Sequence, residues 1–179
     1  MKKNYIPKKV LVVVDMQNDF IDGALGTKEA QEIVDAVYWK IDAYRNSDDL
    51  IIFTRDTHYE DYLYTTEGIK LPVEHCIKDT HGWQITSEIP VADKDIIINK
   101  PTFGSLDLAE ILDEYNISSI EVVGLCTDIC VISNAMILKA KFPEIPISVD
   151  ALCCAGVTPE SHKNALKAMQ MCQIEVTNN

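Results

Sequence analysis

The chain has 179 residues, of which 47% are hydrophobic and 25% are charged, a composition typical of a soluble globular protein. Its 28 Asp and Glu residues outnumber 16 Lys and Arg residues, and the net charge of −12 argues against nucleic-acid binding because nothing basic offsets phosphate repulsion. No apolar stretch approaches the ~20 residues that cross a bilayer, and six cysteines without a secretory signal are typical of reduced cytoplasmic thiols. We therefore expect one domain over residues 1–179, cytoplasmic, with no nucleic-acid or membrane partner.

Strands and helices alternate along the sequence. In chain order the pattern predicts a strand at residues 9–14, a helix at about 28–45, strands at 50–54 and 96–99, a helix opened by Ser105, a strand at 120–125, a helix at about 130–141, a strand at 147–149, a helix from Thr158 and Pro159, and a strand at 173–176. Several strands are continuous Val, Ile and Leu runs, which suit a parallel sheet buried on both faces. Six strands and four helices in this order predict an α/β fold with a mostly parallel sheet and right-handed crossovers.

Three polar residues of different chemistry follow three of these strands: Asp15, Lys100 and Cys130. In open α/β sheets the ligand crevice lies outside the carboxyl ends of the strands. An acid, an amine and a thiol at one rim are the parts of a cysteine nucleophile with its base and its charge partner. Cys130 also lies near the start of a helix, which lowers a thiol pKa and offers backbone N–H groups to an oxyanion. Taken singly, the alternatives are a loop-capping aspartate, a surface amine and a packed thiol.

A second group of candidate residues lies between residue 55 and about residue 95, a stretch with little periodicity. A connection this long inside a compact domain is usually functional. Asp56 and His58 are two residues apart, so on an extended segment both side chains point the same way. With Glu67 and His75 they give a mixed nitrogen and oxygen donor set that suits zinc, iron or manganese. The alternative is a loop rich in solvated polar residues.

Several motifs resemble those of the isochorismatase-like cysteine hydrolases, and most of all the nicotinamidases. The segments that carry the resemblance are VDMQNDF (14–20), DTH (56–58), HCIKDT (75–80), KPTFG (100–104), GLCTDICV (124–131), VDA (149–151) and AGVT (155–158). DTH and HCIKDT resemble the metal loop of the nicotinamidases. The resemblance spans residues 10 to about 176. It implies a single-domain, three-layer α/β/α fold with a mostly parallel, Rossmann-like six-stranded sheet.

The resemblance also implies roles for individual residues. Cys130 is expected as the nucleophile, Asp15 as the base that takes its proton, and Lys100 as the cation that favours the thiolate. The backbone N–H groups of Cys126 and Cys130 are expected to form the oxyanion hole, after a cis Leu125–Cys126 peptide bond. The implied cofactor is one divalent metal ion, zinc in the first place with iron or manganese as alternatives, held by Asp56, His58, Glu67 and His75.

The implied reaction is the hydrolysis of a small-molecule amide, nicotinamide, to nicotinate and ammonia through a thioester. Phe20, Leu71 and Phe103 are the expected walls of the substrate pocket, with Leu71-Pro72 standing where nicotinamidases usually carry a tryptophan before the proline. Two alternatives remain open: an amidase of the same fold acting on a carbamoyl or ureido substrate, and a non-catalytic binding or thiol-sensing protein. Relatives are often oligomeric, so a homo-oligomer is expected by analogy.

Overall fold

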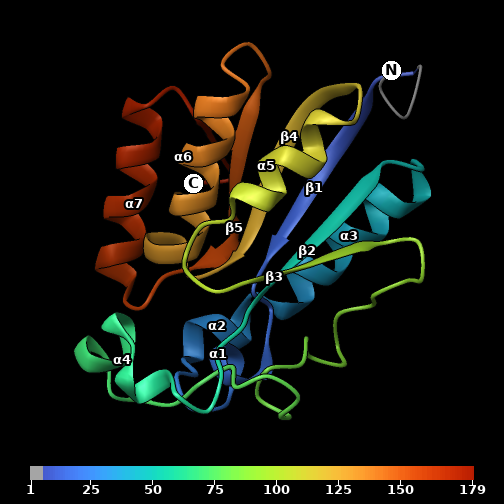
Figure 1. Ribbon diagram of the computed structural model, residues 1–179. Coiled ribbons are helices and arrows are strands. Elements are labelled where there is room, and N and C mark those ends of the chain that lie inside the picture. The colour runs from blue at the N-terminus through green and yellow to red at the C-terminus, as the bar shows by residue number, and fades with distance from the viewer. Residues whose placement is uncertain (1–5) are drawn as a thin grey trace.

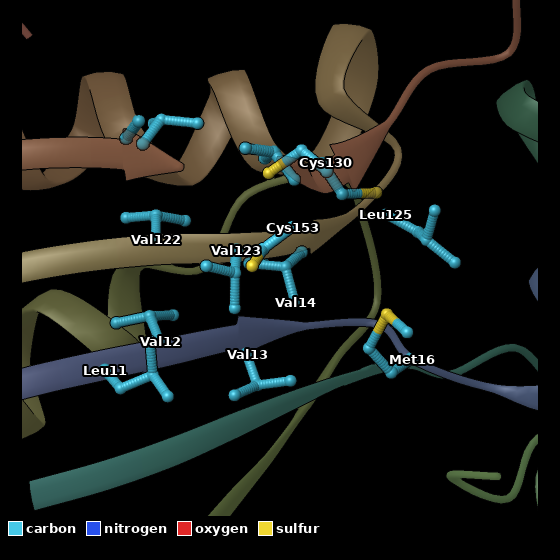
Figure 2. Close-up of a cluster of buried hydrophobic side chains, with 14 of the residues drawn as sticks. Leu11, Val12, Val13, Val14, Met16, Val122, Val123, Leu125, Cys130 and Cys153 are labelled. Carbon is cyan, nitrogen blue, oxygen red and sulfur yellow. The ribbon is translucent and has the colours of Figure 1, made fainter. Parts of the chain in front are cut away.

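Strand β1 (Lys8–Val14) lies inside a six-stranded sheet in the computed structural model, which describes residues 6–179. The strand order is β3-β2-β1-β4-β5-β6, and every neighbouring pair is parallel. Residues 10–14 of β1 have no exposed surface, and Val12 and Val13 lie beside Val122 and Val123 in the core drawn in Figure 2. The other strands are β2 (Leu50–Asp56), β3 (Ile96–Lys100), β4 (Ile117–Leu125), β5 (Ile147–Ala155) and β6 (Glu175–Thr177).

Helices cover both faces of the sheet, as Figure 1 shows. Helix α3 (Val34–Asn46) covers one face and buries Val37 and Ile41 against it. The other face carries α5 (Leu106–Asp113), α6 (Ile132–Lys141) and α7 (Pro159–Met171), which pack side by side. This arrangement is the predicted three-layer α/β/α fold.

Two of the expected helices differ in detail from the prediction. The segment expected as one helix at 28–45 is divided into α2 (Lys28–Glu32) and α3, with a break at Ile33. Ile33 remains buried, so the apolar spacing continues through the break and conceals it from the sequence pattern. The helix expected from residue 130 starts with a wider π-helical turn (Thr127–Val131), in which the Val131 N–H donates to the Cys126 carbonyl five residues back. Cys130 therefore lies inside this turn.

The long segment between β2 and β3 folds over the carboxyl ends of the strands. It contains a short 3₁₀ turn (Tyr62–Tyr64) and helix α4 (Thr66–Lys70), and in Figure 1 it lies near α1 (Asn18–Ile21) and α2. An isolated β-bridge of Gln17 with Ile85 ties it to the residues that follow β1, and a second bridge, His58 with Ile77, joins two parts of the segment itself. Within residues 6–179, no helix is both long enough and apolar enough to cross a membrane.

Candidate active site and metal centre

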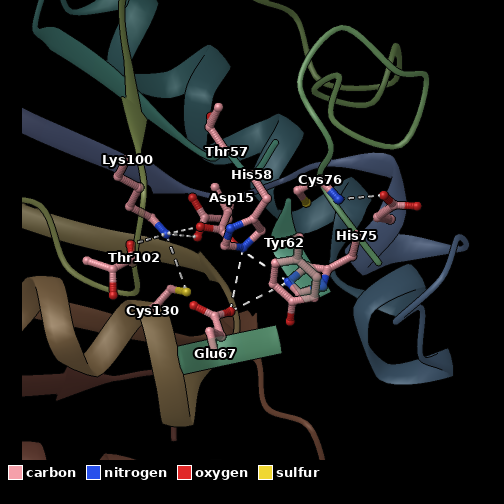
Figure 3. A network of polar contacts seen from close by, with 12 residues as sticks. Asp15, Thr57, His58, Tyr62, Glu67, His75, Cys76, Lys100, Thr102 and Cys130 are labelled. Carbon is pink, nitrogen blue, oxygen red and sulfur yellow. Dashed lines mark hydrogen bonds and ion pairs between the residues drawn. The ribbon is translucent and has the colours of Figure 1, made fainter. Parts of the chain in front are cut away.

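Lys100 is the centre of a buried polar cluster at this end of the sheet (Figure 3). Its Nζ lies 2.6 Å from Asp15 Oδ2 and 3.5 Å from Cys130 Sγ, and it donates to the Thr102 carbonyl at 3.1 Å. The side chains of Lys100 and Asp15 are both 0% exposed. Lys100 is therefore not a surface amine, and the three residues at the ends of β1, β3 and β4 meet in one site.

Parallel strand register explains why these residues meet. Lys100 is the last residue of β3 and pairs with Asp56, the last residue of β2, so its ammonium also lies 3.5 Å from Asp56 Oδ1. Asp15 directly follows β1 and has a left-handed backbone (φ 49°), which Asp tolerates better than most residues. Its Oδ1 accepts a 2.7 Å hydrogen bond from the Thr54 hydroxyl of β2. Both oxygens of the Asp15 carboxylate thus face neighbours from other strands.

A close approach of β4 to β1 brings the cysteine turn to the same place. Gly124 has φ 116°, and a Cβ there would lie 2.1 Å from the Val14 carbonyl oxygen, so only glycine fits. The peptide bond that follows Leu125 is cis, as the family resemblance implies. Buried Asn134 then fastens the turn, because its Nδ2 donates to the Cys130 carbonyl at 2.8 Å and its Oδ1 accepts from the Ser105 N–H at 3.0 Å.

The surroundings of Cys130 favour the neutral thiol. Burial and the Asp15 carboxylate raise the pKa of Cys130 well above its ordinary value of 9.0, and the opposing charge of Lys100 does not cancel them. Burial also raises the pKa of Asp15. For Lys100 burial acts to lower the pKa, but the charges of Asp15, Cys130 and Asp56 outweigh it, so the ammonium stays protonated. The expected lowering of the thiol pKa by the helix start is wrong, because burial outweighs it.

Asp56, His58, Glu67 and His75 converge beside this cluster, each with one donor atom within 4.8 Å of the others. His58 Nε2 lies 3.0 Å from Asp56 Oδ2 and 3.5 Å from Glu67 Oε1. The ring Nδ1 of His75 lies 2.8 Å from the Val73 carbonyl, which leaves Nε2 to face the two carboxylates at 3.6 and 3.8 Å. The group is not the solvated loop that was the alternative, since three of its four members are buried.

Charge balance supports a cation in this group. When all three are ionised, Asp15, Asp56 and Glu67 supply three carboxylates against the single ammonium of Lys100, so with neutral histidines two negative charges lack a counter-charge in a largely buried site. Uncompensated buried charge is costly, and a divalent cation would neutralise it. The donors, two imidazole nitrogens and two carboxylate oxygens, are those that zinc binds. The residues present therefore fit one divalent metal ion.

A cavity of about 290 Å³ joins the two groups. Cys130 and Cys126 line it together with Asp56, Glu67 and His75. The three expected wall residues, Phe20, Leu71 and Phe103, also line it, and Leu71 and Phe103 are 38% and 41% exposed. Four further residues line the cavity that were not predicted from the sequence: Leu25, Thr27, Ile129 and Val157. The cavity is large enough for a small ring and has mainly apolar walls.

Gln17 and Asp19 position the metal group, and sequence analysis gave them no role. The Gln17 side chain is fully buried; its Nε2 donates to the carbonyls of Asp56 and Trp83 at 2.9 and 2.8 Å, and its Oε1 accepts from the Asp56 N–H at 2.7 Å. Asp19 Oδ2 accepts from the Cys76 N–H at 2.7 Å, next to His75. Both residues lie in the VDMQNDF motif directly after the buried strand β1, and the need of polar side chains at such a place for hydrogen-bond partners is a signal that could have identified them.

Known proteins resemble this chain over most of its length. A nicotinamidase of Saccharomyces cerevisiae is 27% identical over 176 residues, covering 72% of this chain and 80% of its own length. The solved structure of a pyrazinamidase of Pyrococcus horikoshii in complex with zinc has a TM-score of 0.85 at 25% identity, covering 97% of this chain and 100% of that one. That of an N-carbamoylsarcosine amidase from Thermoplasma acidophilum has a TM-score of 0.80 at 28% identity, covering 94% and 95%.

The family model of the isochorismatase domain matches residues 9–179. This match confirms the resemblance that the motifs carry, and the solved structures confirm the fold class. With nearly its whole length matched, the chain belongs to the isochorismatase domain family.

Proposed function

We propose that this protein is a metal-dependent cysteine amidohydrolase that converts nicotinamide to nicotinate and ammonia. One observation carries the proposal: Lys100 Nζ lies 2.6 Å from Asp15 and 3.5 Å from Cys130, beside a four-residue nitrogen and oxygen donor group in the same cavity. The relatives named nicotinamidase and pyrazinamidase support this choice of amide. The proposed unit is a single domain over residues 1–179.

In the first half of the reaction Cys130 is the nucleophile. Because its thiol is protonated at rest, attack on the amide carbonyl requires transfer of the thiol proton to Asp15 as the S–C bond forms. The protonated Lys100 stabilises the negative charge that passes between sulfur and carboxylate. Asp15 then gives the proton to the amide nitrogen, the C–N bond breaks, and ammonia leaves a thioester on Cys130.

In the second half water replaces the thiol. Asp15, ionised again, takes a proton from a water molecule that attacks the thioester carbonyl, and the C–S bond breaks to release nicotinic acid, which loses its carboxyl proton to solvent and becomes nicotinate. The backbone N–H groups of Cys126 and Cys130 are the proposed donors to the oxyanion in both halves. The thiolate leaving group regains its proton from Asp15, which restores the starting state.

Asp56, His58, Glu67 and His75 would hold the metal ion. When bound, a divalent ion supplies a Lewis-acid position for the ring nitrogen of the substrate, which orients the ring and its amide. Phe20, Leu71 and Phe103 would enclose the ring of the substrate. Orientation of this kind contributes several kcal/mol to lowering a barrier.

Ammonia release from nicotinamide tests the proposal. Cys130→Ala should fold and lose essentially all turnover, whereas Cys126→Ala should keep most of it, since Cys126 is proposed to act through its backbone. Cys172→Ala, at an exposed cysteine, is the matched control. Benzamide has the same shape as nicotinamide without the ring nitrogen and should be a far poorer substrate. Equal turnover of the two amides would contradict the role given to the ring nitrogen.

An amidase acting on a carbamoyl or ureido substrate is the second candidate. The similarity to an N-carbamoylsarcosine amidase favours it, at an identity comparable with that of the nicotinamidase relatives. The same assay separates the two, because N-carbamoylsarcosine should release ammonia without need of the metal group. A non-catalytic or thiol-sensing protein is less favoured, since a buried Asp, Lys and Cys in contact are costly to keep without a reaction to serve.

Three further expectations are part of the proposal. A small-molecule amide is the proposed substrate, and a second copy of the chain is the proposed partner. A cytoplasmic location is supported by the six cysteines, all of which lie within the described residues and are unpaired.

A further inference from the structure

Tyr62 is fully buried, and its ring contacts those of His58 and His75, two of the candidate metal ligands. The sequence motifs predict no role for it. It opens the 3₁₀ turn between His58 and Glu67 and is 0% exposed, whereas Tyr64 in the same turn is 85% exposed. Figure 3 draws its ring against those of His58 and His75. Its hydroxyl donates to the Leu71 carbonyl and not to a donor atom of the group, so any role in metal binding is a positioning one.

The Tyr62 ring contacts both imidazoles of the metal group. Its centroid lies 4.6 Å from that of His58 and 5.0 Å from that of His75, with interplanar angles of 52° and 80°. The two imidazoles lie 4.9 Å apart at 72°. Tilted and edge-to-face ring pairs are favourable and directional. Three rings in mutual contact therefore restrict the rotation of both histidines, whose Nε2 atoms face Asp56 and Glu67.

The polar atoms of Tyr62 hold both ends of helix α4, which carries Glu67. Its carbonyl accepts from the N–H and the hydroxyl of Thr65, the residue that caps the start of α4, at 2.9 and 2.7 Å. Its hydroxyl donates to the carbonyl of Leu71 at the other end, at 2.9 Å. The packing is close, because a Cβ on Gly68 would lie 2.0 Å from the Tyr62 carbonyl oxygen.

We propose that Tyr62 is a positioning residue of the metal group, since it contacts both histidines and both ends of the helix that carries Glu67. The inference rests on the metal binding contained in the proposed function. Outer partners of metal ligands orient them, and their loss typically weakens metal binding 10- to 100-fold. Through Leu71, Tyr62 also sets one wall of the cavity.

Zinc affinity of the whole chain, measured by competition with a chromogenic chelator, tests this without reference to turnover. Tyr62→Leu removes the ring and the hydroxyl and should weaken zinc binding about 10- to 100-fold. Tyr62→Phe keeps the ring contacts and should bind zinc nearly as tightly as the wild type. It should raise the KM for nicotinamide, because Leu71 in the cavity wall loses its hydrogen bond to the tyrosine hydroxyl. Tyr64→Leu and Tyr64→Phe, in the same turn but exposed, are the matched controls and should change neither quantity.

Cobalt substitution adds a readout of geometry, since the visible absorption of bound Co²⁺ should shift in Tyr62→Leu and not in Tyr64→Leu. If Tyr62→Leu does not fold, Gly68→Ala takes its place: the added methyl forces α4 away from the Tyr62 carbonyl and should weaken zinc binding. If Tyr62→Leu folds, an unchanged zinc affinity in that variant overturns the inference. If Tyr62→Leu does not fold, an unchanged zinc affinity in Gly68→Ala overturns it. A Tyr62-dependent zinc affinity without nicotinamide hydrolysis instead overturns the proposed reaction alone.

Discussion

Lys100 has an ammonium group that faces two buried carboxylates and one buried thiol. It lies within 3.5 Å of Asp15, Asp56 and Cys130, and its side chain has no exposed surface. A charged group buried this deeply must be balanced by its neighbours. Lys100 therefore links the proposed nucleophile to the metal group, and its removal should affect both stability and chemistry.

Lys100→Met should abolish amide hydrolysis and destabilise the fold. The change leaves Asp15 and Asp56 buried without their cation, and breaking a buried pair in this way costs about 3–5 kcal/mol. The double change Asp15→Asn with Lys100→Met should recover part of that stability, because a neutral amide needs no counter-charge. Urea unfolding measures the stability, and Lys167→Met, at an exposed lysine, is the control.

Turnover should behave differently from stability in this series. Residues that act as one unit lose activity non-additively, so Asp15→Asn, Lys100→Met and the double variant should be similarly inactive. Losses that multiply in the double variant would show that the two residues act separately.

At the scale of elements, the turn that carries Cys130 is tied to the loop after β3. Asn134 of α6 is fully buried and donates to the carbonyls of Cys130 and Phe103, at 2.8 and 3.2 Å, and it accepts from the Ser105 N–H. One side chain thus sets the distance between the nucleophile and a wall of the cavity. It also satisfies the buried backbone groups of Cys130 and Ser105 and the part-buried carbonyl of Phe103.

Asn134→Leu should leave those backbone groups without partners. A buried polar group that loses its partner costs about 1–3 kcal/mol, so the free energy of unfolding should fall by at least that amount. The nucleophile and Phe103 should also lose their fixed spacing, which should lower kcat for nicotinamide. Asn164→Leu, at an exposed position of α7, is the control for both measurements. A wild-type kcat in Asn134→Leu would show that the hydrogen bonds of Asn134 stabilise the fold and do not position Cys130 for catalysis.

A second contact between elements, the ion pair of Lys40 with Asp150, predicts that the stability of the fold decreases at acidic pH. Lys40 of α3 lies 2.7 Å from Asp150 of β5 and 2.8 Å from Glu121 of β4. Burial acts to raise the pKa of Asp150, but the hydrogen bond and charge of Lys40 outweigh it and hold that pKa below its ordinary value of 3.8. A carboxyl whose pKa is lower when folded binds fewer protons in the folded state. Its stabilising contribution is therefore full above pH 3.8 and is lost as the pH falls through the folded pKa.

Lys40→Met should accordingly flatten the fall in stability below about pH 4, near the unfolded pKa of an aspartate. The free energy of unfolding, measured at several pH values, gives the slope for each variant. Lys28→Met removes an exposed ion pair with Glu32 and should leave the wild-type slope unchanged. Identical slopes in wild type and Lys40→Met would contradict the assignment to Asp150.

At the scale of the whole molecule, the segment between β2 and β3 folds over the site, and we expect a metal ion bound there to stabilise it. Asp56 lies at the end of β2, and Glu67 and His75 lie within the segment, so a bound ion would join them. A ligand that binds only the folded state stabilises it by about 2.7 kcal/mol at 100 times its Kd.

Chelation should therefore lower the Tm of the purified protein and abolish nicotinamide turnover, and zinc should restore both. Limited proteolysis of the metal-free chain should cut between residues 59 and 74. His58→Ala should behave like the chelated protein. His81→Ala, at a loop histidine outside the metal group, is the control and should respond to zinc as the wild type does. A Tm that does not respond to chelation or zinc would contradict the metal site.

The sequence determined the features that depend on local pattern and residue type. Runs of Val and Ile identified the strands, and their alternation with amphipathic helices predicted a parallel α/β sheet, because apolar spacing reports which face of an element is buried. Parallel strands bring their carboxyl ends to one edge, so Asp15, Lys100 and Cys130 could be grouped before any contact was known. Motif resemblance added the metal residues and the cis Leu125–Cys126 bond.

Tertiary structure alone decided the features that arise from contacts between distant residues. The raised pKa of Cys130 depends on burial, which outweighs the effect of a helix start. Gln17, Asn134 and Tyr62 owe their roles to hydrogen bonds and ring contacts that cross between elements, and no local pattern encodes such partners. The break between α2 and α3 at Ile33 could not be predicted, because the helical spacing of buried apolar residues continues through it. In each case the deciding quantity is the surroundings of a side chain, which exist only once the chain has folded.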